Sequence, residues 1–331
     1  MLRFNHPILK FICSKSKIDF LRCDYLANAK NIIVEKKNEN ISNLKSMTSG
    51  IKAGDGGSLI LNEIEKEELV KQFPNSKPLI KNYVGADDFM NGGKRFCLWI
   101  TEENKKTAYS FAPLVKRFEK CRELRLKSKK AATVKKADKP YQFDETTFTN
   151  APAILIPQTG SEKRDYVPIG FINADTIISN AARAIYNPET FLFSVISSRM
   201  HIVWVKAVAG RLKTDMQYSN TLCYNTFPFP NITEIQKKEL EKHVYKVLAE
   251  REAHSEKTLA QLYDPEKMPD GLREAHHQLD LAVEHCYRAK PFETDEERLE
   301  YLFKLYEQMI DDENNSGTLF ASNPKPKKKN K

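Results

Sequence analysis

A proline-rich segment, Phe227-Pro228-Phe229-Pro230, divides the chain into two parts whose apolar residues follow different spacings. Proline lacks a backbone N–H and has a fixed φ angle, so a helix or a central strand cannot continue through this segment. After it, apolar residues recur every three or four residues, as in helices; before it, short apolar runs are mixed with helical stretches. We therefore expect an α+β fold, in which a mixed α/β domain precedes a small all-helical domain.

Three helices are predicted after the proline-rich segment, and they would form a small bundle. Thr233 with Gln236 and Thr294 with Glu297 have the spacing of a capping box, which marks the start of a helix. A further apolar stripe begins at Leu272. The lysine-rich end of the chain cannot bury an apolar face, and we expect it to be disordered.

Short strands bounded by turn residues are predicted before the proline-rich segment, at residues 95–100, 153–156 and 166–171. Asn187-Pro188 is a favoured helix start, with asparagine as the cap and proline in the first turn. The apolar residues that follow predict a single helix that ends at Gly210.

Positive charge is concentrated in residues 1–230, which carry 36 basic and 23 acidic side chains, against 17 and 21 in residues 231–331. A helix is predicted from about residue 113 to residue 132. Between residues 116 and 130 it carries eight basic and two acidic side chains, and a polyanion would relieve their repulsion. The alternative is a lysine-rich face that contacts only water. We expect DNA or RNA phosphates to contact Lys116, Arg117, Lys120, Arg122, Arg125, Lys129 and Lys130, with Arg211 and Lys213 extending the same surface.

A loop between two predicted strands, Ser161-Glu162-Lys163-Arg164, combines a carboxylate with two cationic side chains. In the major groove, arginine pairs with guanine and glutamate accepts a hydrogen bond from cytosine. The loop is therefore a candidate for base readout. A plain hairpin turn explains the same four residues.

Membrane, disulfide and common cofactor motifs are not found. No stretch approaches the roughly 20 apolar residues of a membrane span, and the six cysteines lie far apart, so we expect a cytoplasmic protein with reduced thiols. The sequence also lacks a glycine-rich nucleotide loop, an Asn-Pro-Pro-aromatic motif and a zinc-binding spacing of histidine and cysteine. We expect no catalytic, cofactor-binding or metal-binding residue in this chain.

One pattern favours a metal-dependent nuclease instead. Glu35-Lys36-Lys37 follows an apolar strand, and Asp19 or Asp24 could supply the second carboxylate of a site that activates water. The pattern is short and common, and a strand that ends in charged residues explains it without chemistry.

Several ordered blocks of sequence resemble the C-terminal portion of the MmeI-like restriction–modification proteins. The similarity extends from about residue 25 to residue 313. Its blocks are residues 31–38, 55–59, 83–100, 166–172, 198–220, 224–231 and 262–281.

This resemblance implies that the chain corresponds to the last part of a longer protein. Full-length members combine a nuclease domain that uses Mg²⁺, a helical connector, a domain that transfers a methyl group from S-adenosylmethionine to adenine N6, a target-recognition domain and a C-terminal helical domain. By resemblance, residues 1–58 are the trailing edge of the methyltransferase domain, 59–230 the target-recognition domain, 231–313 the helical domain and 314–331 a disordered basic tail. The family's cofactor-binding and catalytic motifs would lie upstream, so we expect the chain to be inactive alone.

The resemblance also implies double-stranded DNA as the partner. The basic helix and Arg211-Leu212-Lys213 would contact phosphates, and loop 161–164 would read bases. The target adenine has to leave the base stack for a pocket supplied by an upstream methyltransferase polypeptide. Two alternatives stay open: a free-standing specificity subunit that recruits a separate methyltransferase, and a nuclease that uses Glu35 and Lys37.

Overall fold

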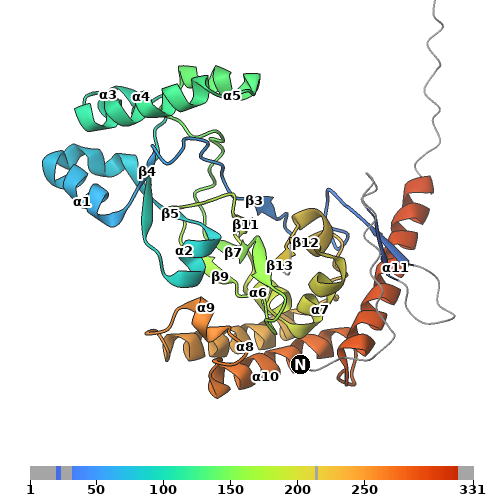
Figure 1. Cartoon of the computed structure of the whole chain (residues 1–331). Coiled ribbons are helices and arrows are strands. Elements are labelled where there is room, and N and C mark those ends of the chain that lie inside the picture. The colour runs from blue at the N-terminus through green and yellow to red at the C-terminus, as the bar shows by residue number, and fades with distance from the viewer. Residues whose placement is uncertain (1–19, 24–31, 213–214, 320–331) are drawn as a thin grey trace, which may run out of the picture.

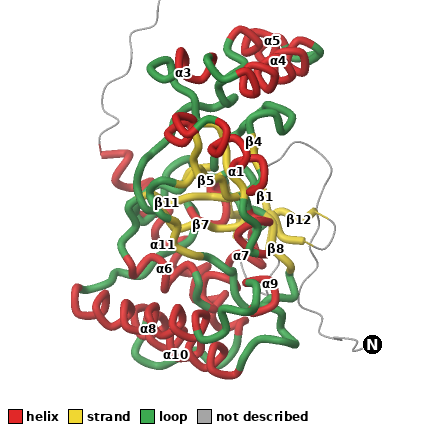
Figure 2. Tube along the Cα trace, turned by 90° about the vertical axis from the view of Figure 1, so that its left-hand side faces the viewer, coloured by secondary structure: helices red, strands yellow, loops and turns green. Residues whose placement is uncertain are grey.

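The computed structural model describes residues 20–23, 32–212 and 215–319, which place sheets between two groups of helices (Figure 1). Figure 2, turned by 90°, shows the same order of layers, with α4 and α5 at one end and α8 and α10 at the other. The expected α+β fold is confirmed, because a mixed α/β region is followed by the helical region α8–α11.

The first end of the molecule is a four-stranded sheet covered by helices. Its strand order is β10-β5-β6-β4, with β10 parallel to β5 and the other pairs antiparallel. The strands are β4 (Ile60–Leu61), β5 (Ile80–Val84), β6 (Arg95–Leu98) and β10 (Thr176–Ile178). The helices are α1 (Glu63–Gln72), η1 (Pro74–Leu79), α2 (Ala86–Asn91), α3 (Lys105–Tyr109), α4 (Ala112–Leu126), α5 (Ala131–Lys135) and η2 (Lys136–Asp138).

A second sheet, with the order β3-β11-β7-β9, lies in the middle of the molecule and is antiparallel throughout. All five residues of β7 are buried, since this strand is central and both of its faces are covered. The strands are β3 (Thr48–Ser49), β7 (Ala153–Pro157), β9 (Gly170–Ile172) and β11 (Ala182–Tyr186). The smaller pairings are β1 (Phe20–Cys23) with β2 (Ile32–Glu35), and β13 (Asp215–Gln217) with both β8 (Thr159–Ser161) and β12 (Gly210–Leu212).

The helices of the second end share one apolar core with the middle sheet. Trp204 is fully buried, and its ring faces those of Phe227, Phe303 and Tyr306. The proline-rich segment therefore packs inside the protein. These helices are α6 (Thr190–Ile196), α7 (Arg199–Val208), η3 (Asn220–Tyr224), α8 (Glu234–Glu252), α9 (Leu259–Leu262), α10 (Asp270–Tyr287) and α11 (Asp295–Leu319).

The predicted helix 188–210 is wrong as a single helix. Asn187 has a positive φ of 48° and Glu189 occupies the cap position of α6. The chain then bends by 56° between α6 and α7. Hydroxyls at the bend add to the main-chain hydrogen bonds. Ser197 Oγ and Ser197 N both donate to Phe193 O, at 2.8 and 3.0 Å, and Ser198 Oγ accepts from His201 N as the cap of α7.

Two other boundaries differ from the prediction. The strand expected at 166–171 pairs only as β9, since Pro168 has no N–H for a ladder. The helix expected at 113–132 ends at Leu126, and α5 follows it separately.

Local start signals are confirmed at the second end of the molecule. Thr233 and Gln236 form the full capping box of α8, with N–O distances of 3.3 and 2.9 Å. Thr294 accepts from Glu297 N at 3.1 Å, but the Glu297 carboxylate accepts instead from Glu293 N. The disorder expected from residue 314 is wrong as far as Leu319, because α11 continues to that residue; residues 320–331 lie outside the described part.

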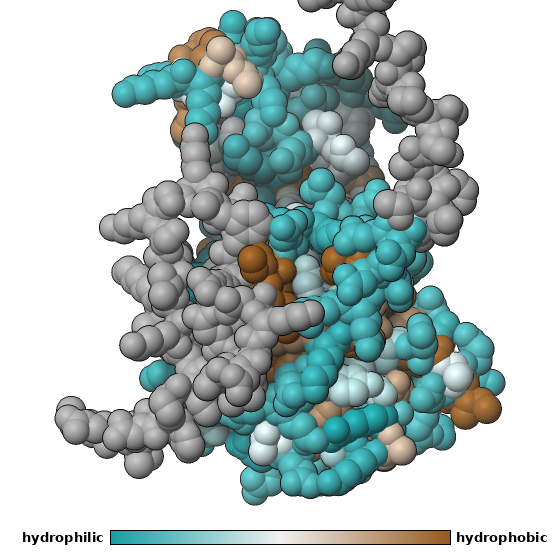
Figure 3. All heavy atoms as spheres, turned by 90° about the vertical axis from the view of Figure 1, so that its right-hand side faces the viewer, coloured by the Kyte–Doolittle hydropathy of each residue, from teal (hydrophilic) through white to brown (hydrophobic). Residues whose placement is uncertain are grey.

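Most large apolar side chains lie inside the protein, and hydrophilic residues dominate the face shown in Figure 3. Among the described residues, no helix taken singly has the length and apolar character of a membrane span. Only the bent pair α6–α7 reaches that composition, and nearly all of its side chains are buried in the core.

The position of Phe227 gives a stability prediction. Phe227→Ala removes a fully buried ring that packs against His201 and Phe229, at centroid distances of 4.6 and 4.8 Å. Urea titration is expected to show that the free energy of unfolding falls by about 3–5 kcal/mol. Tyr245→Ala is the control, because that ring is 60% exposed on α8, and its expected loss is below about 0.5 kcal/mol. Equal losses in the two variants would contradict a shared core at Phe227.

Candidate nucleic-acid interface

Helix α4 has one buried face and one charged face. Leu114, Phe118, Cys121 and Arg125 are buried, and their spacing places them on the side that faces the core of the first end. The opposite side is exposed and carries cations. The sequence therefore folds locally as an amphipathic helix whose solvent face is basic.

Arg125 does not belong to the exposed face, and its predicted phosphate contact is wrong. The side chain is 0% exposed. Its guanidinium donates to main-chain carbonyl oxygens at 2.7 to 3.1 Å, which joins α4 to the segments before and after it. The acceptors are the carbonyls of Gly54, Lys136, Lys139 and Gln142. A buried cation with these partners cannot reach a phosphate.

Arg117 is also occupied within the fold. It donates to the carbonyl oxygens of Ser58 and Ile60 at 3.0 and 3.2 Å and forms an ion pair with Glu65. Partial burial by itself raises the pKa of the Glu65 carboxyl. The hydrogen bond from Asn62 N–H and the ion pair with Arg117 outweigh this effect, and the pKa is lowered. Arg117 therefore fastens α4 to β4 and α1, and contact with a phosphate would require it to give up these partners.

The remaining cations of α4, and those of residues 127–135 after it, lie on the surface of the protein. They are exposed, and within the described residues their side chains form no salt bridge or hydrogen bond. This unpaired set consists of Lys116, Lys120, Arg122, Lys127, Lys129, Lys130 and Lys135, and we call it the basic surface. It includes five of the seven phosphate contacts predicted on this helix.

The loop Ser161–Arg164, hereafter the recognition loop, begins at the end of β8. Strand β13 pairs with both β8 and β12, which brings Glu162 to Arg211, and the two side chains form an ion pair. A residue predicted to read bases is thus paired with a residue predicted to contact phosphate. Lys163 is exposed, and Lys213 lies outside the described residues.

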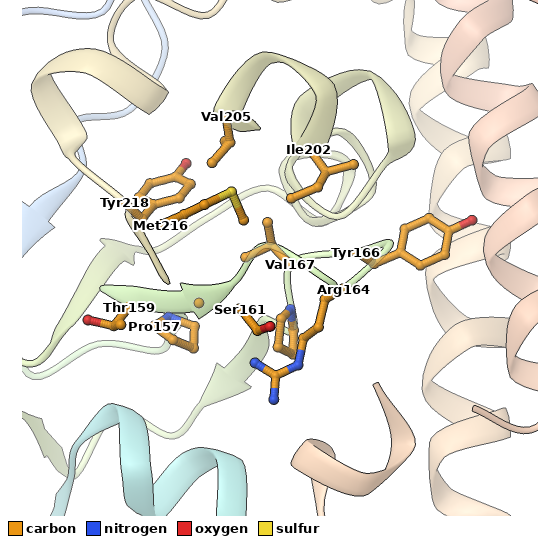
Figure 4. A pocket seen from close by; sticks show the side chains of 12 residues that line it. Pro157, Thr159, Ser161, Arg164, Tyr166, Val167, Ile202, Val205, Met216 and Tyr218 are labelled. Atoms are coloured by element: carbon orange, nitrogen blue, oxygen red, sulfur yellow. The ribbon is translucent and has the colours of Figure 1, made fainter. Parts of the chain in front are cut away.

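Arg164 is partly buried, and its guanidinium has no hydrogen bond or salt bridge to any described residue. It borders a surface cavity of about 350 Å³ that is also lined by Ser161, Lys163, Asp264 and Pro265. Figure 4 looks into a neighbouring pocket that Arg164 also lines, and it shows the Arg164 side chain directed away from Ile202 and Val205 of α7. Burial lowers the pKa of Arg164, against the opposing effects of Asp264 and Asp215. A partly desolvated cation without a partner indicates that a ligand with acceptor atoms would bind here favourably.

The structure keeps the two predicted elements apart. Helix α4 lies at the first end of the molecule, whereas β8 and the recognition loop lie near α7 and α9 (Figure 2). The basic surface and the recognition loop are therefore separate candidate contacts, and an extended partner is needed to touch both.

Sequence reasoning missed the residues that hold the recognition loop. Tyr166 donates to Asp280 at 2.8 Å, and Asp165 pairs with Arg199 at 3.1 Å. Burial raises the pKa of the Asp280 carboxyl to about 7, although Arg199 N–H and Tyr166 oppose the shift. No local pattern indicates these contacts, because the partners are far apart in the sequence.

The residues of the nuclease alternative have structural contacts instead. Lys37 Nζ pairs with Glu313 of α11 at 2.7 Å, and the Glu35 amide donates to the Tyr306 hydroxyl at 3.4 Å. Asp19 and Asp24 lie outside the described residues. In the part of the chain that is described, no three His, Cys, Asp or Glu side chains are arranged to hold a metal ion.

Comparison with known proteins identifies relatives for nearly the whole chain. The family model described as "MmeI, target recognition domain" matches residues 28–231, and the one described as "MmeI, C-terminal domain" matches residues 232–312. The chain is 42% identical, over 287 residues, to DNA methyltransferase A of Bacillus subtilis (strain 168), covering 87% of this chain and 32% of that protein. The structure also resembles the type IIL restriction–modification enzyme MmeI, solved in complex with DNA, with a TM-score of 0.80 and 32% identity. That match covers 89% of this chain and 42% of the MmeI chain.

Two arginines of α4, one buried and one exposed, give different predictions for folding stability. Arg125→Ala removes a buried guanidinium and leaves the carbonyls of Gly54 and Gln142 without their donor, so chemical denaturation is expected to show a loss of about 2–4 kcal/mol in the free energy of unfolding. Arg122→Ala, on the exposed face, is expected to change the unfolding free energy by less than about 0.5 kcal/mol. An Arg125→Ala variant with an unchanged free energy of unfolding would return Arg125 to the set of candidate phosphate contacts.

Proposed function

The chain belongs to the MmeI family, of which it carries the target-recognition and C-terminal domains, and we propose that it reads a specific sequence in double-stranded DNA. The observation that carries this proposal is the partly buried guanidinium of Arg164, which has no partner among the described residues and lies beside an open cavity. Such a group can donate two parallel hydrogen bonds to O6 and N7 of guanine in the major groove.

Glu162 and Arg211 support the same proposal. Their ion pair neutralises both charges while no DNA is bound. On the duplex, phosphate can replace Glu162 as the partner of Arg211, which leaves the carboxylate able to accept from N4 of cytosine. Ser161 and Lys163 are the further readout candidates of the loop.

The basic surface is proposed to bind phosphates without regard to sequence. Its side chains are exposed and unpaired within the described residues, so contact with DNA breaks no ion pair there. Contacts of this kind release condensed counterions, and they set orientation and overall affinity. Contacts with the bases are then made by the recognition loop.

The chemistry is proposed to take place on other domains of the family. The chain spans 32% of the B. subtilis relative and 42% of MmeI. By resemblance, transfer of a methyl group from S-adenosylmethionine to adenine N6, and cleavage with Mg²⁺, belong to domains that precede these two. The role of this chain is then to hold the duplex while the target adenine is flipped into a pocket of an upstream methyltransferase polypeptide.

Removal of charge from the basic surface tests the phosphate contacts. The triple variant Lys116→Ala, Lys120→Ala, Arg122→Ala is expected to bind every duplex more weakly. The plot of log K against log salt should flatten by about 0.9 for each lost contact. Fluorescence anisotropy at several salt concentrations measures both quantities. The control removes three exposed lysines from the helical region, Lys238, Lys246 and Lys257. An equal effect of the two triple variants would show that the basic surface contacts phosphates no more than other exposed lysines do.

Arg164→Ala tests base readout. Selection from a pool of randomised duplexes is expected to show relaxed preference at one guanine position, by about 1–3 kcal/mol, while affinity for random DNA changes little. Lys238→Ala, which removes an exposed lysine of α8 that is not a readout candidate, is the control and should keep the preference. Identical selected sequences for the wild-type chain and Arg164→Ala would refute the role given to Arg164.

A further inference from the structure

The recognition loop is fastened at both of its ends, and the second fastening comes from the helical region. At the first end, Ser161 pairs with Asp215 in the ladder of β8 and β13. At the second end, the next two residues, Asp165 and Tyr166, bind side chains of α7 and α10.

One buried carboxylate joins this second end to the helices. Asp280 of α10 is 6% exposed, and its two oxygens have different partners. Oδ2 accepts from the Tyr166 hydroxyl at 2.8 Å, and Oδ1 accepts from the Arg199 amide, at the start of α7, at 2.6 Å. The Tyr166 ring also stacks on His276 of α10, with centroids 4.1 Å apart.

A second acid, Asp295 at the start of α11, acts through Arg199. Its oxygens accept from Nε and Nη2 of Arg199 at 2.9 and 2.7 Å, which is the two-point geometry of a strong arginine–carboxylate pair. The third nitrogen, Nη1, donates to Asp165 at 3.1 Å. Arg199 therefore links the residue that follows the recognition loop to α11.

The helical region also borders the cavity beside Arg164. Ala260, Asp264 and Pro265, which belong to α9 and the turn after it, line one side of that cavity. Arg273 of α10 approaches Asp165 at 3.7 Å. The surroundings of the recognition loop thus come from several points of the region after the proline-rich segment.

Base readout requires that its donors stay fixed, because hydrogen bonds to base edges tolerate small displacements only. We infer that α10 and α11 set the geometry of the recognition loop, with Asp280 and Asp295 as positioning residues that act through Tyr166 and Arg199. The inference rests on the proposed function. It means that the sequence preference of the chain depends on residues of the helical region that need not touch DNA.

The experiment measures preference and affinity separately in the whole chain. Tyr166→Phe keeps the ring and removes only the hydroxyl that binds Asp280, and Asp295→Asn weakens the pair with Arg199. Glu300→Gln is the control, because Glu300 is exposed on α11 and pairs only with Lys304 among the described residues. Each protein is tested on the duplex selected by the wild-type chain, on that duplex with the Arg164-dependent base changed, and on random DNA, with thermal unfolding recorded alongside.

Tyr166→Phe and Asp295→Asn are each expected to reduce the discrimination at that base by about tenfold, with random-DNA affinity within about twofold of the wild type. Adding Tyr166→Phe to Arg164→Ala should cause no further loss, since both changes act on the same contact. A purely structural role would lower the unfolding temperature and leave the discrimination intact, which overturns the inference.

Two other results are decisive. Discrimination that survives in Tyr166→Phe and Asp295→Asn overturns the inference alone, while the proposed function stands. A wild-type chain that selects no sequence overturns the proposed function, and the inference falls with it. If Asp295→Asn fails to fold, the discrimination measured for Tyr166→Phe alone tests the inference, because Tyr166→Phe retains the ring stacked on His276.

Discussion

The burial of Trp204 is the contact on which the arrangement of the molecule depends. Its indole lies on α7 and faces Phe227 from the proline-rich segment and Phe303 and Tyr306 from α11. These rings come from both sides of the sequence boundary at the prolines, so the middle sheet and the C-terminal helices share one core. The recognition loop leads into residues fastened to α7 and takes its place from that core.

Charge serves two purposes on the same helix. Arg125 lies on the buried stripe of α4 and binds carbonyl oxygens, whereas Arg122 lies outside and has no partner among the described residues. The first stabilises the fold, and the second is available to a polyanion. Net charge alone cannot distinguish these roles, because depth in the structure decides which partner a guanidinium meets.

Local features could be predicted from the sequence, and long-range ones could not. The capping box of Thr233 and Gln236 depends on residues three apart, and it forms as predicted. Arg125 follows Cys121 by four residues on the apolar stripe, so its burial could have been inferred from spacing. At the bend, the hydroxyls of Ser197 and Ser198 donate to carbonyls of the preceding turn, a side-chain contact that apolar periodicity does not report.

The candidate site also combines features that could be predicted from the sequence with features that could not. The chemistry of Glu162 and Arg164 can be read directly from the sequence, but the hydrogen bond of Tyr166 to Asp280 joins residues 114 positions apart and needs the folded core. The chain is proposed to distinguish one DNA sequence from others. The decisive measurement compares, at one fixed salt concentration, the affinity for the duplex selected from a random pool with the affinity for random duplex. We expect the selected duplex to bind at least about 10³-fold more tightly, and equal affinity for the two would refute sequence-specific binding by this chain.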